Sequence, residues 1–460
     1  MGYVAVRGGG KAIEESLKLL EYQRVSASSA WGTDEIEGTF PELVDQVMGE
    51  ASLYAPRLAA LALKQAQGSP DEAVFLLRAF RSTLERPYVS RPVDTGAMRV
   101  NRRVSAAFKD VPGGQVLGAT RDYSHRLLAF DLETEGAEEL AEKRAELAAH
   151  FEKVAEALEA APDVAPAASP CAEIPVGASC CPPAGAQQGT PTKSPDTAVP
   201  GAPQTPATLP RVLDYLRAQG LLAHVEADDA PPVDATMAPL SFPAPRSVRL
   251  QTLARGMTQA VEALGYAAIR GFGPAHPTVG ELRSGRVAVA VDHPLEAGGE
   301  QDAYYLGSVP VTEVESVFES EGESDADGGT ATATRSDGGG LSLAIGYGLV
   351  FGRAETKAIA MSVLDHCLER GDKRFPTEDE EFVLYHVDGV EATGFISHLK
   401  LPHYVTFQSK LSSVRGTRDE HSECGECDPH GTRVAHDPQS TRDPHDQPAE
   451  SKEARDAAAL

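Results

Sequence analysis

The chain has 460 residues, of which 41% are hydrophobic, and a formal net charge of −26 at pH 7. This length and composition predict a globular protein of two or three domains, and the acidity argues against nucleic-acid binding, which requires a basic face. The longest apolar stretch falls short of the roughly 20 residues that span a membrane, and no secretory signal precedes the first charges. We therefore expect a cytoplasmic protein without membrane contact.

Three segments have compositions that do not support a packed core. Residues 161–210 contain twelve prolines and no aromatic residue, which predicts a semi-extended linker. Residues 319–342 form an acidic insertion rich in Gly, Ser and Thr, and residues 412–460 predict a disordered acidic tail because they lack aromatic residues. The remaining sequence falls into two blocks, residues 1–160 and 211–411.

The first block combines helices with short strands. Val74, Leu77 and Phe80 recur at the helical period, which indicates a buried helix face. In chain order we expect a strand at 3–6 that ends in Gly8-Gly9-Gly10, helices at 11–21, 57–68 and 71–85, a turn at 111–115, and an amphipathic helix at 140–158 that leads into the linker.

The second block has the same mixed character. Gly371 follows a helical pattern and is expected to cap it. We expect helices at 212–222, 250–268 and 354–369, a Gly-punctuated strand at 345–352, and further strands at 287–291, 382–385 and 392–396. The predicted fold class is α+β, with two blocks of helices and short strands joined by the Pro-rich linker and followed by the disordered tail.

Charge is unevenly distributed along the sequence. Residues 57–126 hold twelve Lys or Arg against six acids, and residues 242–286 hold six Arg against two acids. Residues 313–337 hold eight acids and one Arg. The two basic segments are either scattered surface charge or the walls of one anion site within an acid-coated protein.

Two glycine motifs precede predicted helices. Gly8-Gly9-Gly10 could direct backbone N–H groups at a phosphate, but it lacks the spacing of a dinucleotide fingerprint or a P-loop, so a tight turn is the simpler interpretation. The second motif, Gly346 to Gly352, has an apolar interior that indicates close packing. Neither a GxSxG nor an HExxH motif is present.

His398 and His403 form the first candidate metal site. A separation of five residues places them about 140° apart on a helix and on opposite faces of a strand. Because Pro402 interrupts the segment, a turn could bring both imidazoles to one ion, with Lys400 nearby for an anion. Two ligands leave a zinc site incomplete, and a chance pair among thirteen His is the alternative interpretation.

The tail contains a second set of possible ligands. His421, Cys424, Cys427 and His430 form a His-x2-Cys-x2-Cys-x2-His string, and these ligand types suit zinc. The segment has no apolar core that would orient them, so adventitious binding or no role is the simpler interpretation. The six cysteines lack the pattern of a disulfide framework, which favours a reducing compartment.

Several blocks of the sequence resemble the PhnI family, a subunit of the carbon–phosphorus lyase core complex. They occur in order and cover nearly all the sequence outside the three low-complexity segments, which are additions to the family pattern. The blocks are YVAVRGGGKAI at 3–13, LAALALKQAQG at 58–68, AVFLLRAFRSTL at 73–84, residues 98–130, RGFGPAHPTVGELRSG at 270–285, GYGLVFGRAETKAIAMSVLD at 346–365, and residues 379–408, which include FISHLKLPHY.

The resemblance implies a function. The family is associated with making α-D-ribose 1-methylphosphonate 5-triphosphate from ATP and methylphosphonate, with release of adenine. The subunit is thought to act with sister subunits, among them a radical lyase subunit, and alone it is similar to a purine nucleosidase. The resemblance also implies that His398 and His403 bind zinc or another divalent metal at a shared site, and that ATP is used with magnesium.

A triphosphate site would use the basic segments, although no residue that protonates the leaving base is identified. We expect anion contacts from charged side chains in the matching blocks, with Tyr123 as a neighbour: Arg102, Arg103, Lys109, Arg121, His125, Arg283 and Lys400. Two other functions remain open at this point. One is a non-catalytic scaffold that donates metal ligands to a shared site, and the other is a stand-alone nucleoside triphosphate nucleosidase.

Overall fold

The computed structural model describes residues 9–26, 30–111, 113–160, 209–222, 232–272, 276–293, 303–320, 342–401 and 403–423. The chain forms two compact units, Arg7–Ile396 and a second unit that contains Ser397–Leu460. Among the described residues, no helix is long and apolar enough to cross a membrane. The linker at 161–208, the acidic insertion at 321–341 and the strand predicted at 3–6 lie outside the described residues.

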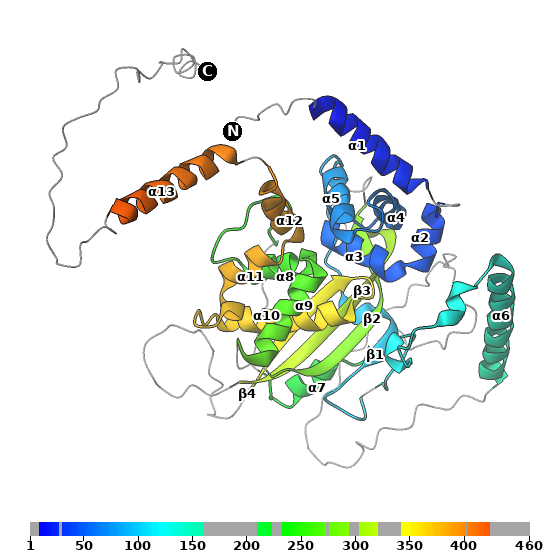
Figure 1. Ribbon diagram of the computed structural model, residues 1–460. Helices are drawn as coiled ribbons and strands as arrows, with labels where there is room; N and C mark the ends of the chain where they lie inside the picture. Colours follow the sequence, from blue (N-terminus) through cyan, green and yellow to red (C-terminus); the bar gives the residue numbers. More distant parts are fainter. Residues whose placement is uncertain are drawn as a thin grey trace, which may run out of the picture. The chain divides into compact units, whose positions relative to one another are not determined.

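A four-stranded antiparallel meander in the order β1-β2-β3-β4 forms the sheet of the first unit (Figure 1). The strands are β1 (Arg99–Val104), β2 (Thr278–Asp292), β3 (Ala303–Ser320) and β4 (Ser342–Phe351). Because β1 comes from the first sequence block and pairs with β2 of the second, both blocks contribute to one sheet. The prediction of an α+β fold is confirmed. The expectation of short strands is wrong for β2 and β3, which have 15 and 18 residues.

The helices account for most of the remaining described residues. They are α1 (Gly9–Arg24), α2 (Thr33–Thr39), α3 (Pro41–Ala51), α4 (Pro56–Gln65), α5 (Pro70–Arg81), α6 (Ala137–Ala160), α7 (Val212–Ala218), α8 (Arg246–Arg255), α9 (Thr258–Ala267), α10 (Glu355–Arg370), α11 (Glu380–His386), α12 (Gly389–His398) and α13 (Tyr404–Glu423). Short 3-10 turns lie at Thr95–Ala97, Arg121–Tyr123, Phe130–Glu133 and Pro376–Glu378, and a π turn lies at Ala268–Phe272.

Helices α2 to α5 pack around their own apolar cluster. Pro41, Pro56 and Pro70 each begin a helix, a position where the missing N–H of proline has no intrahelical partner to lose. Val74 and Leu77 of α5 are buried in this cluster, as their spacing predicts. Phe80, by contrast, is exposed although it lies in the last turn of α5, and the helix ends at Arg81 rather than at residue 85.

Helix α10 lies directly against β4, and two glycines allow the close approach. A Cβ atom at Gly346 would lie 1.9 Å from the carbonyl oxygen of Ser362, and one at Gly348 would lie 2.1 Å from that of Ala358. The close packing predicted for this motif is confirmed. Gly371 adopts a left-handed conformation (φ 64°) and caps α10, also as predicted.

Three sequence predictions need correction. The segments 382–385 and 392–396, expected as strands, lie in helices α11 and α12. Asp379 caps α11 by accepting a hydrogen bond from the Phe382 N–H (3.2 Å), and Asp388 accepts one from the Glu391 N–H (3.1 Å) at the start of α12. These caps outweigh the β-branched and aromatic composition of both segments. The helix expected at 250–268 is broken into α8 and α9 at Gly256.

The expected start of the disordered tail at residue 412 is also wrong, because α13 continues to Glu423. Residues 404–423 contain no proline, so a helix can continue through them although few of them are apolar. The first proline after the helix is Pro429. The Cys424–Cys427–His430 part of the possible zinc string lies outside the described residues.

Candidate functional site

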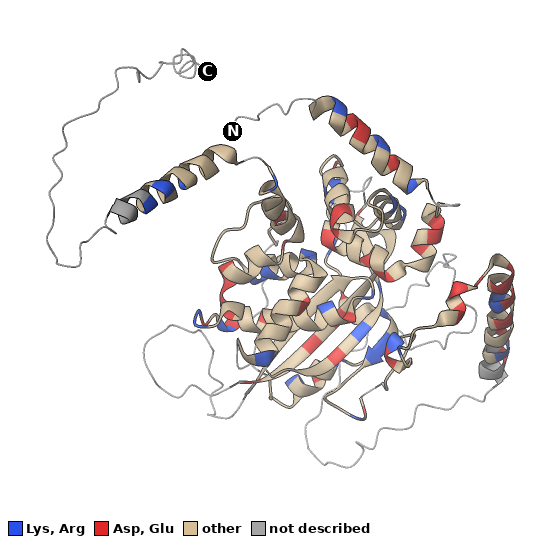
Figure 2. Ribbon diagram, in the orientation of Figure 1, with Lys and Arg blue, Asp and Glu red and all other residues tan. Residues whose placement is uncertain are grey.

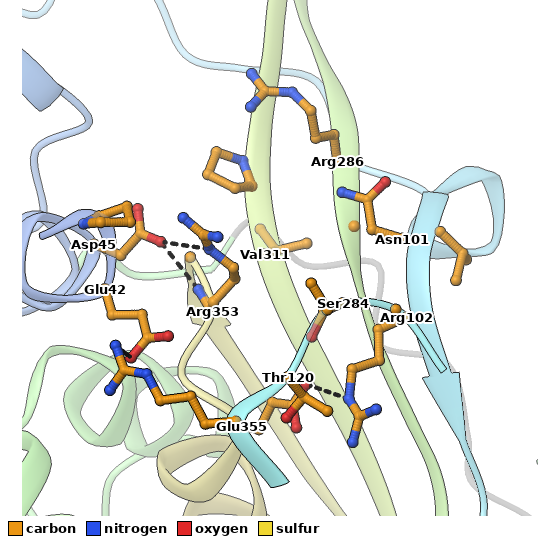
Figure 3. A pocket seen from close by; sticks show the side chains of 18 of the residues that line it. Glu42, Asp45, Asn101, Arg102, Thr120, Ser284, Arg286, Val311, Arg353 and Glu355 are labelled. Carbon is orange, nitrogen blue, oxygen red and sulfur yellow. Dashed lines mark hydrogen bonds and ion pairs between the residues drawn. The ribbon is translucent and has the colours of Figure 1, made fainter. Parts of the chain in front are cut away.

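A cavity of about 2180 Å³ lies in the first unit between helix α3, strands β1 and β2, residues 115–122 and the start of α10 (Figure 3). Its wall contains an unusual number of guanidinium groups and no Lys or His among the described residues. The charged residues that line it are Arg99, Arg102, Arg121, Arg126, Arg286 and Arg353, together with Glu37, Glu42, Asp45, Asp122 and Glu355.

The adjacent residues Arg102 and Arg103 lie on opposite faces of β1, because side chains alternate along a strand. Arg102 pairs in register with Ser284 and lines the cavity, whereas Arg103 pairs in register with Arg283. The expected phosphate contacts are therefore divided by the sheet. Of the pair, only Arg102 is in a position to meet a ligand in the cavity.

Carboxylates in the cavity wall already pair with several of its arginines. The Arg102 Nε lies 2.8 Å from Glu355 Oε1, and the Arg121 Nη2 lies 3.1 Å from Glu42 Oε2. The Arg353 backbone N–H donates to Asp45 Oδ2 (3.2 Å). Burial raises the pKa of Asp45 above its usual range, and contact with Arg353 offsets this only in part. An anionic ligand would therefore compete with, or exchange for, these carboxylates.

The Arg102 side chain is held in place by several contacts in the cavity wall. Its side chain is 8% exposed and also donates to the backbone oxygen of Leu117, and its guanidinium carbon lies 5.9 Å from the centre of the Tyr123 ring. Burial alone would lower the pKa of Arg102, but Tyr123 and Glu355 together raise it. Fixed contacts of this kind orient a guanidinium for bidentate recognition of an oxyanion.

The remaining candidates from the basic segments lie at different places. Arg121 is exposed and lines the cavity, while Lys109 and His125 are exposed and do not line it. Lys400 lies in the second unit, where its backbone N–H donates to the Ser397 carbonyl (3.1 Å). Among the expected anion contacts, the structure thus brings together Arg102 and Arg121, with Tyr123 beside them.

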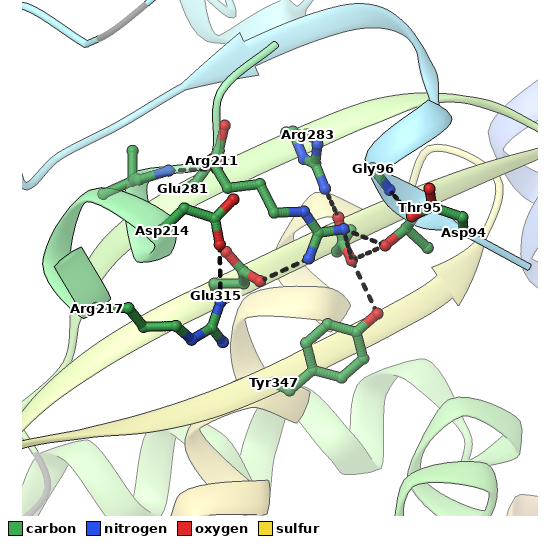
Figure 4. A network of polar contacts seen from close by, with 12 residues as sticks. Asp94, Thr95, Gly96, Arg211, Asp214, Arg217, Glu281, Arg283, Glu315 and Tyr347 are labelled. Carbon is green, nitrogen blue, oxygen red and sulfur yellow. Dashed lines mark hydrogen bonds and ion pairs between the residues drawn. The ribbon is translucent and has the colours of Figure 1, made fainter. Parts of the chain in front are cut away.

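Arg103 and Arg283 belong to a buried polar network on the other face of the sheet, and Figure 4 shows the part of this network around Arg283. Arg103 pairs with Glu281 and Arg283 with Glu313, and all four side chains are at most 2% exposed. Arg103, Arg283 and Glu313 occupy matched positions on β1, β2 and β3. These arginines are occupied by carboxylates in the interior, so they hold the strands together instead of facing the cavity.

Arg211, at the start of α7, completes this network. It contacts Glu315 Oε1 (3.2 Å) and Glu313 Oε1 (3.4 Å), and the Tyr347 hydroxyl donates to Glu313 (2.9 Å). Burial and the negative charge of Glu313 raise the pKa of Glu315 to about 7, and Glu315 Oε2 has no hydrogen-bond partner among the described residues. Glu313 and Glu315, at the start of the acidic segment 313–337, are therefore buried and do not lie on the protein surface. Figure 2 shows acidic and basic positions on the strands of the sheet.

His398 and His403 lie at the two ends of a turn in the second unit. Helix α12 ends at His398 and α13 begins at Tyr404, and the Leu401 N–H donates to the His398 carbonyl (2.9 Å). The two ring centres are 5.5 Å apart. Two imidazoles that share one tetrahedral zinc ion have ring centres roughly 5 Å apart, given a Zn–N distance of about 2 Å. The turn is present as predicted, and the spacing of the rings fits two ligands of one ion.

The histidine pair would supply only part of a coordination shell. No group of three or more His, Cys, Asp or Glu side chains within the described part of the chain could hold a metal. The His403 Nε2 also lies 3.3 Å from the His398 carbonyl oxygen, so the present contact of this ring is with the chain itself. Metal binding by the pair remains a prediction.

Sequence reasoning missed four arginines that line the cavity, Arg99, Arg126, Arg286 and Arg353. Arg286 donates to the Ser308 hydroxyl (2.8 Å) from β2, and Arg353 follows β4 next to Asp45. Both lie inside the family-like or basic segments, but charge counting could not show which of these side chains face the cavity. Gly352 could have been a signal, because its φ of 70° turns the chain so that Arg353 meets Asp45.

Comparisons with known proteins agree over most of the chain. Residues 2–421 match the family described as bacterial phosphonate metabolism protein (PhnI). HtxH of Stutzerimonas stutzeri is 39% identical over 426 residues, which cover 91% of this chain and 97% of HtxH. The α-D-ribose 1-methylphosphonate 5-triphosphate synthase subunits PhnI of Rhizobium meliloti and Escherichia coli are 39% and 38% identical, over 91% of this chain and 95% and 99% of their own lengths. This chain therefore belongs to the PhnI family of bacterial phosphonate metabolism proteins.

Proposed function

We propose that this chain is a subunit of an α-D-ribose 1-methylphosphonate 5-triphosphate synthase that acts in phosphonate metabolism. The observation that carries the proposal is the match to two named subunits of this enzyme at 38–39% identity over 91% of the chain. In the proposed reaction a methylphosphonate oxygen bonds to the anomeric carbon of the ribose of ATP. The carbon–nitrogen bond to adenine breaks, and adenine leaves with a proton.

The cavity in the first unit is the proposed site for the triphosphate. The transition state of such a displacement has oxocarbenium character, so it benefits from clamped phosphates and from a fixed electrostatic environment. Arg102 and Arg121 are the proposed phosphate contacts, and Arg286 and Arg353 are added from the cavity wall. Arg102, Arg121 and Arg353 contact Glu355, Glu42 and Asp45. These contacts support a site in which the bound triphosphate replaces the carboxylates as the partner of the arginines.

His398 and His403 are proposed to hold a divalent metal, with zinc the first choice. The ring separation of 5.5 Å supports this assignment. When bound, such an ion would supply Lewis-acid chemistry. Because the pair provides two ligands, the rest of the shell would come from substrate oxygens, water or a partner subunit.

Exposed apolar side chains support assembly with partner subunits. Leu127, Leu128 and Phe130 form a run on the first unit whose side chains are 82%, 77% and 68% exposed. In the second unit, Leu399 and Phe407 near the histidine pair are each 60% exposed. Contiguous exposed apolar surface marks an interaction site, which supports the proposal that a partner subunit binds near the histidine pair.

The proposal is tested by adenine release from ATP. The purified chain is assayed alone, with sister subunits, and with sister subunits plus methylphosphonate, while the phosphonate product is followed by phosphorus NMR. We expect the triphosphate product only when the sister subunits and methylphosphonate are both present. Equal adenine release by the isolated chain, unaffected by partners, would instead identify a stand-alone nucleosidase.

A scaffold function makes a different prediction in the same assay. If the chain only donates metal ligands, Arg102→Gln should leave the rate and the KM for ATP unchanged, whereas His398→Ala should abolish turnover. Metal content of the purified complex provides the second readout. We expect replacement of either histidine to remove one metal equivalent while assembly is retained, and unchanged metal content would show that the pair is structural.

A further inference from the structure

Four arginines gather where the C-terminal ends of α5 and α8 meet residues 234–236, outside the cavity described above. Arg78 and Arg81 come from the last turn of α5, Arg86 follows it, and Arg255 is the last residue of α8. None of these four residues, named here the arginine cluster, lines the cavity. The carboxylates that face them are Asp234 and Asp388, so the cluster carries two more positive than negative charges.

Two members of the arginine cluster are paired with the carboxylates. Arg78 binds both oxygens of Asp388 (2.8 Å each) and donates to the carbonyls of Glu50 (3.0 Å) and Arg255 (3.3 Å). Arg86 pairs with Asp234 and donates to the Thr236 hydroxyl (3.1 Å). Both acids are therefore already occupied by these two arginines.

The other two members lack partners for buried N–H groups. Among the described residues, the Nε and Nη1 of Arg81 and the Nε of Arg255 are shielded from solvent without a hydrogen bond. Arg255 donates once, from Nη1 to the Ala235 carbonyl (3.0 Å). A buried N–H of a charged group without a partner is costly, so such groups in a native protein call for an explanation.

Helix ends account for part of this arrangement but not for all of it. A cation at a helix C-terminus is favoured by the helix dipole, which explains why arginine occurs at both ends. It does not explain why the cations crowd one another. Burial together with repulsion from Arg78 and Arg81 lowers the pKa of Arg255 to about 10, and burial with repulsion from Arg86 and Arg78 lowers the pKa of Arg81.

We propose that Arg81 and Arg255 bind an oxyanion of the phosphate class, a dianion held by their unpartnered N–H groups and by the excess charge of the arginine cluster. A phosphate or phosphate monoester carries between one and two negative charges near pH 7, which matches an excess of two, whereas one carboxylate would neutralise half of it. Guanidinium groups present paired N–H donors that suit phosphate oxygens. The ligand could be free phosphate or the phosphate of an ester, since the group that binds is the same.

The experiment measures phosphate binding to the full chain by calorimetry at constant ionic strength. Inorganic phosphate and ribose 5-phosphate are titrated separately, because tighter binding of one distinguishes the free anion from an ester. Arg81→Gln and Arg255→Gln are compared with Arg57→Gln, an exposed residue of α4, and with Arg102→Gln in the cavity. We expect saturable binding that is weakened about tenfold or more by the first two substitutions and unchanged by Arg57→Gln, while Arg102→Gln reports any binding of the same anions in the cavity.

Several results would overturn the proposal. Loss of phosphate binding in Arg102→Gln with retention in Arg81→Gln would move the site to the cavity, and equal binding of acetate and phosphate would exclude a dianion site. Thermal unfolding without phosphate gives an independent readout. Because the guanidinium groups repel each other, Arg81→Gln should unfold at the same or a higher temperature than the parent, and phosphate should raise its unfolding temperature less than that of the parent. A large fall in unfolding temperature without phosphate would instead make Arg81 a structural residue.

Discussion

The two faces of strand β1 use the same residue type for different purposes. Arg102 faces the cavity and shares its charge with Glu355 and Tyr123, while Arg103 is buried and pairs with Glu281. On the cavity face, a ligand in the cavity could replace Glu355 as the partner of Arg102. On the buried face no ligand can replace Glu281 as the partner of Arg103, since the carboxylate left behind would be buried without a counter-charge. Adjacent arginines therefore divide into one expected to act in binding and one expected to act in stability.

The largest effect is expected on the buried face. Arg103→Met should lower the free energy of unfolding by about 3–5 kcal/mol, because Glu281 would lose its charged partner in the interior. Urea unfolding followed by circular dichroism measures the change. The double variant Arg103→Met with Glu281→Leu should recover much of the loss, since no buried charge remains uncompensated. A single variant as stable as the parent would refute the structural role of Arg103.

The same face should also make stability depend on pH. The pKa of Glu315 is raised to about 7 in the folded protein from an ordinary 4.5, so between these values the folded state holds a proton that the unfolded state releases. Stability contributed by this group is complete below pH 4.5 and is lost as pH rises through 7, by up to about 3 kcal/mol. The unfolding free energy of Glu315→Gln, minus that of the parent, should therefore rise between pH 5 and 8. A difference that stays constant over this range would show that Glu315 does not titrate there.

On the cavity face the expected effect is on binding. Arg102→Gln in the assembled complex should weaken ATP binding by roughly 1.5–3 kcal/mol, the value of a charge-assisted hydrogen bond, and leave adenosine binding unchanged. Equilibrium binding of both ligands measures the difference. Equal weakening of the two would point to damage of the fold, and that result would remove the distinction between the two faces.

The smallest effect is expected where an arginine of the cavity is exposed. Arg121 is 77% exposed and pairs with the half-exposed Glu42, and such surface pairs contribute about 1 kcal/mol or less. Arg121→Gln should therefore change the unfolding free energy by less than that amount. Urea unfolding in parallel with Arg103→Met provides the comparison, and similar losses in both variants would mean that burial does not separate the two pairs.

Helical periodicity and capping residues predicted much of the fold. The helices at 57–68 and 71–85 and the Gly371 cap follow from local patterns, and the close packing at Gly346 follows from a glycine among apolar residues. Strand β3 was missed because Glu313 and Glu315 give it the composition of a solvated segment. Their burial depends on Arg283 and Arg211, which lie 30 and 104 residues away, so no local window contains the cause.

The candidate site was predictable only in part for a similar reason. Counting charges located the basic segments, but it could not separate Arg102 from Arg103, since that separation requires the position of a strand. Once the position of β1 is known, the alternation of side chains along a strand shows that Arg102 and Arg103 lie on opposite faces. The turn between His398 and His403 was predictable from Pro402, whereas metal binding by the pair stays a prediction.

The glycine contacts between β4 and α10 fix the helix against the strand at one side of the cavity. Since Gly346 and Gly348 bring the strand against the helix backbone, Glu355 at the start of α10 has a fixed depth relative to the sheet. Residues 115–122 also line the cavity, and their contact with α3 is made by an exposed ion pair, Arg121 with Glu42. Adaptation to ligands of different length is therefore expected to occur by displacement of residues 115–122, so variants with altered substrate range should arise there and not in α10.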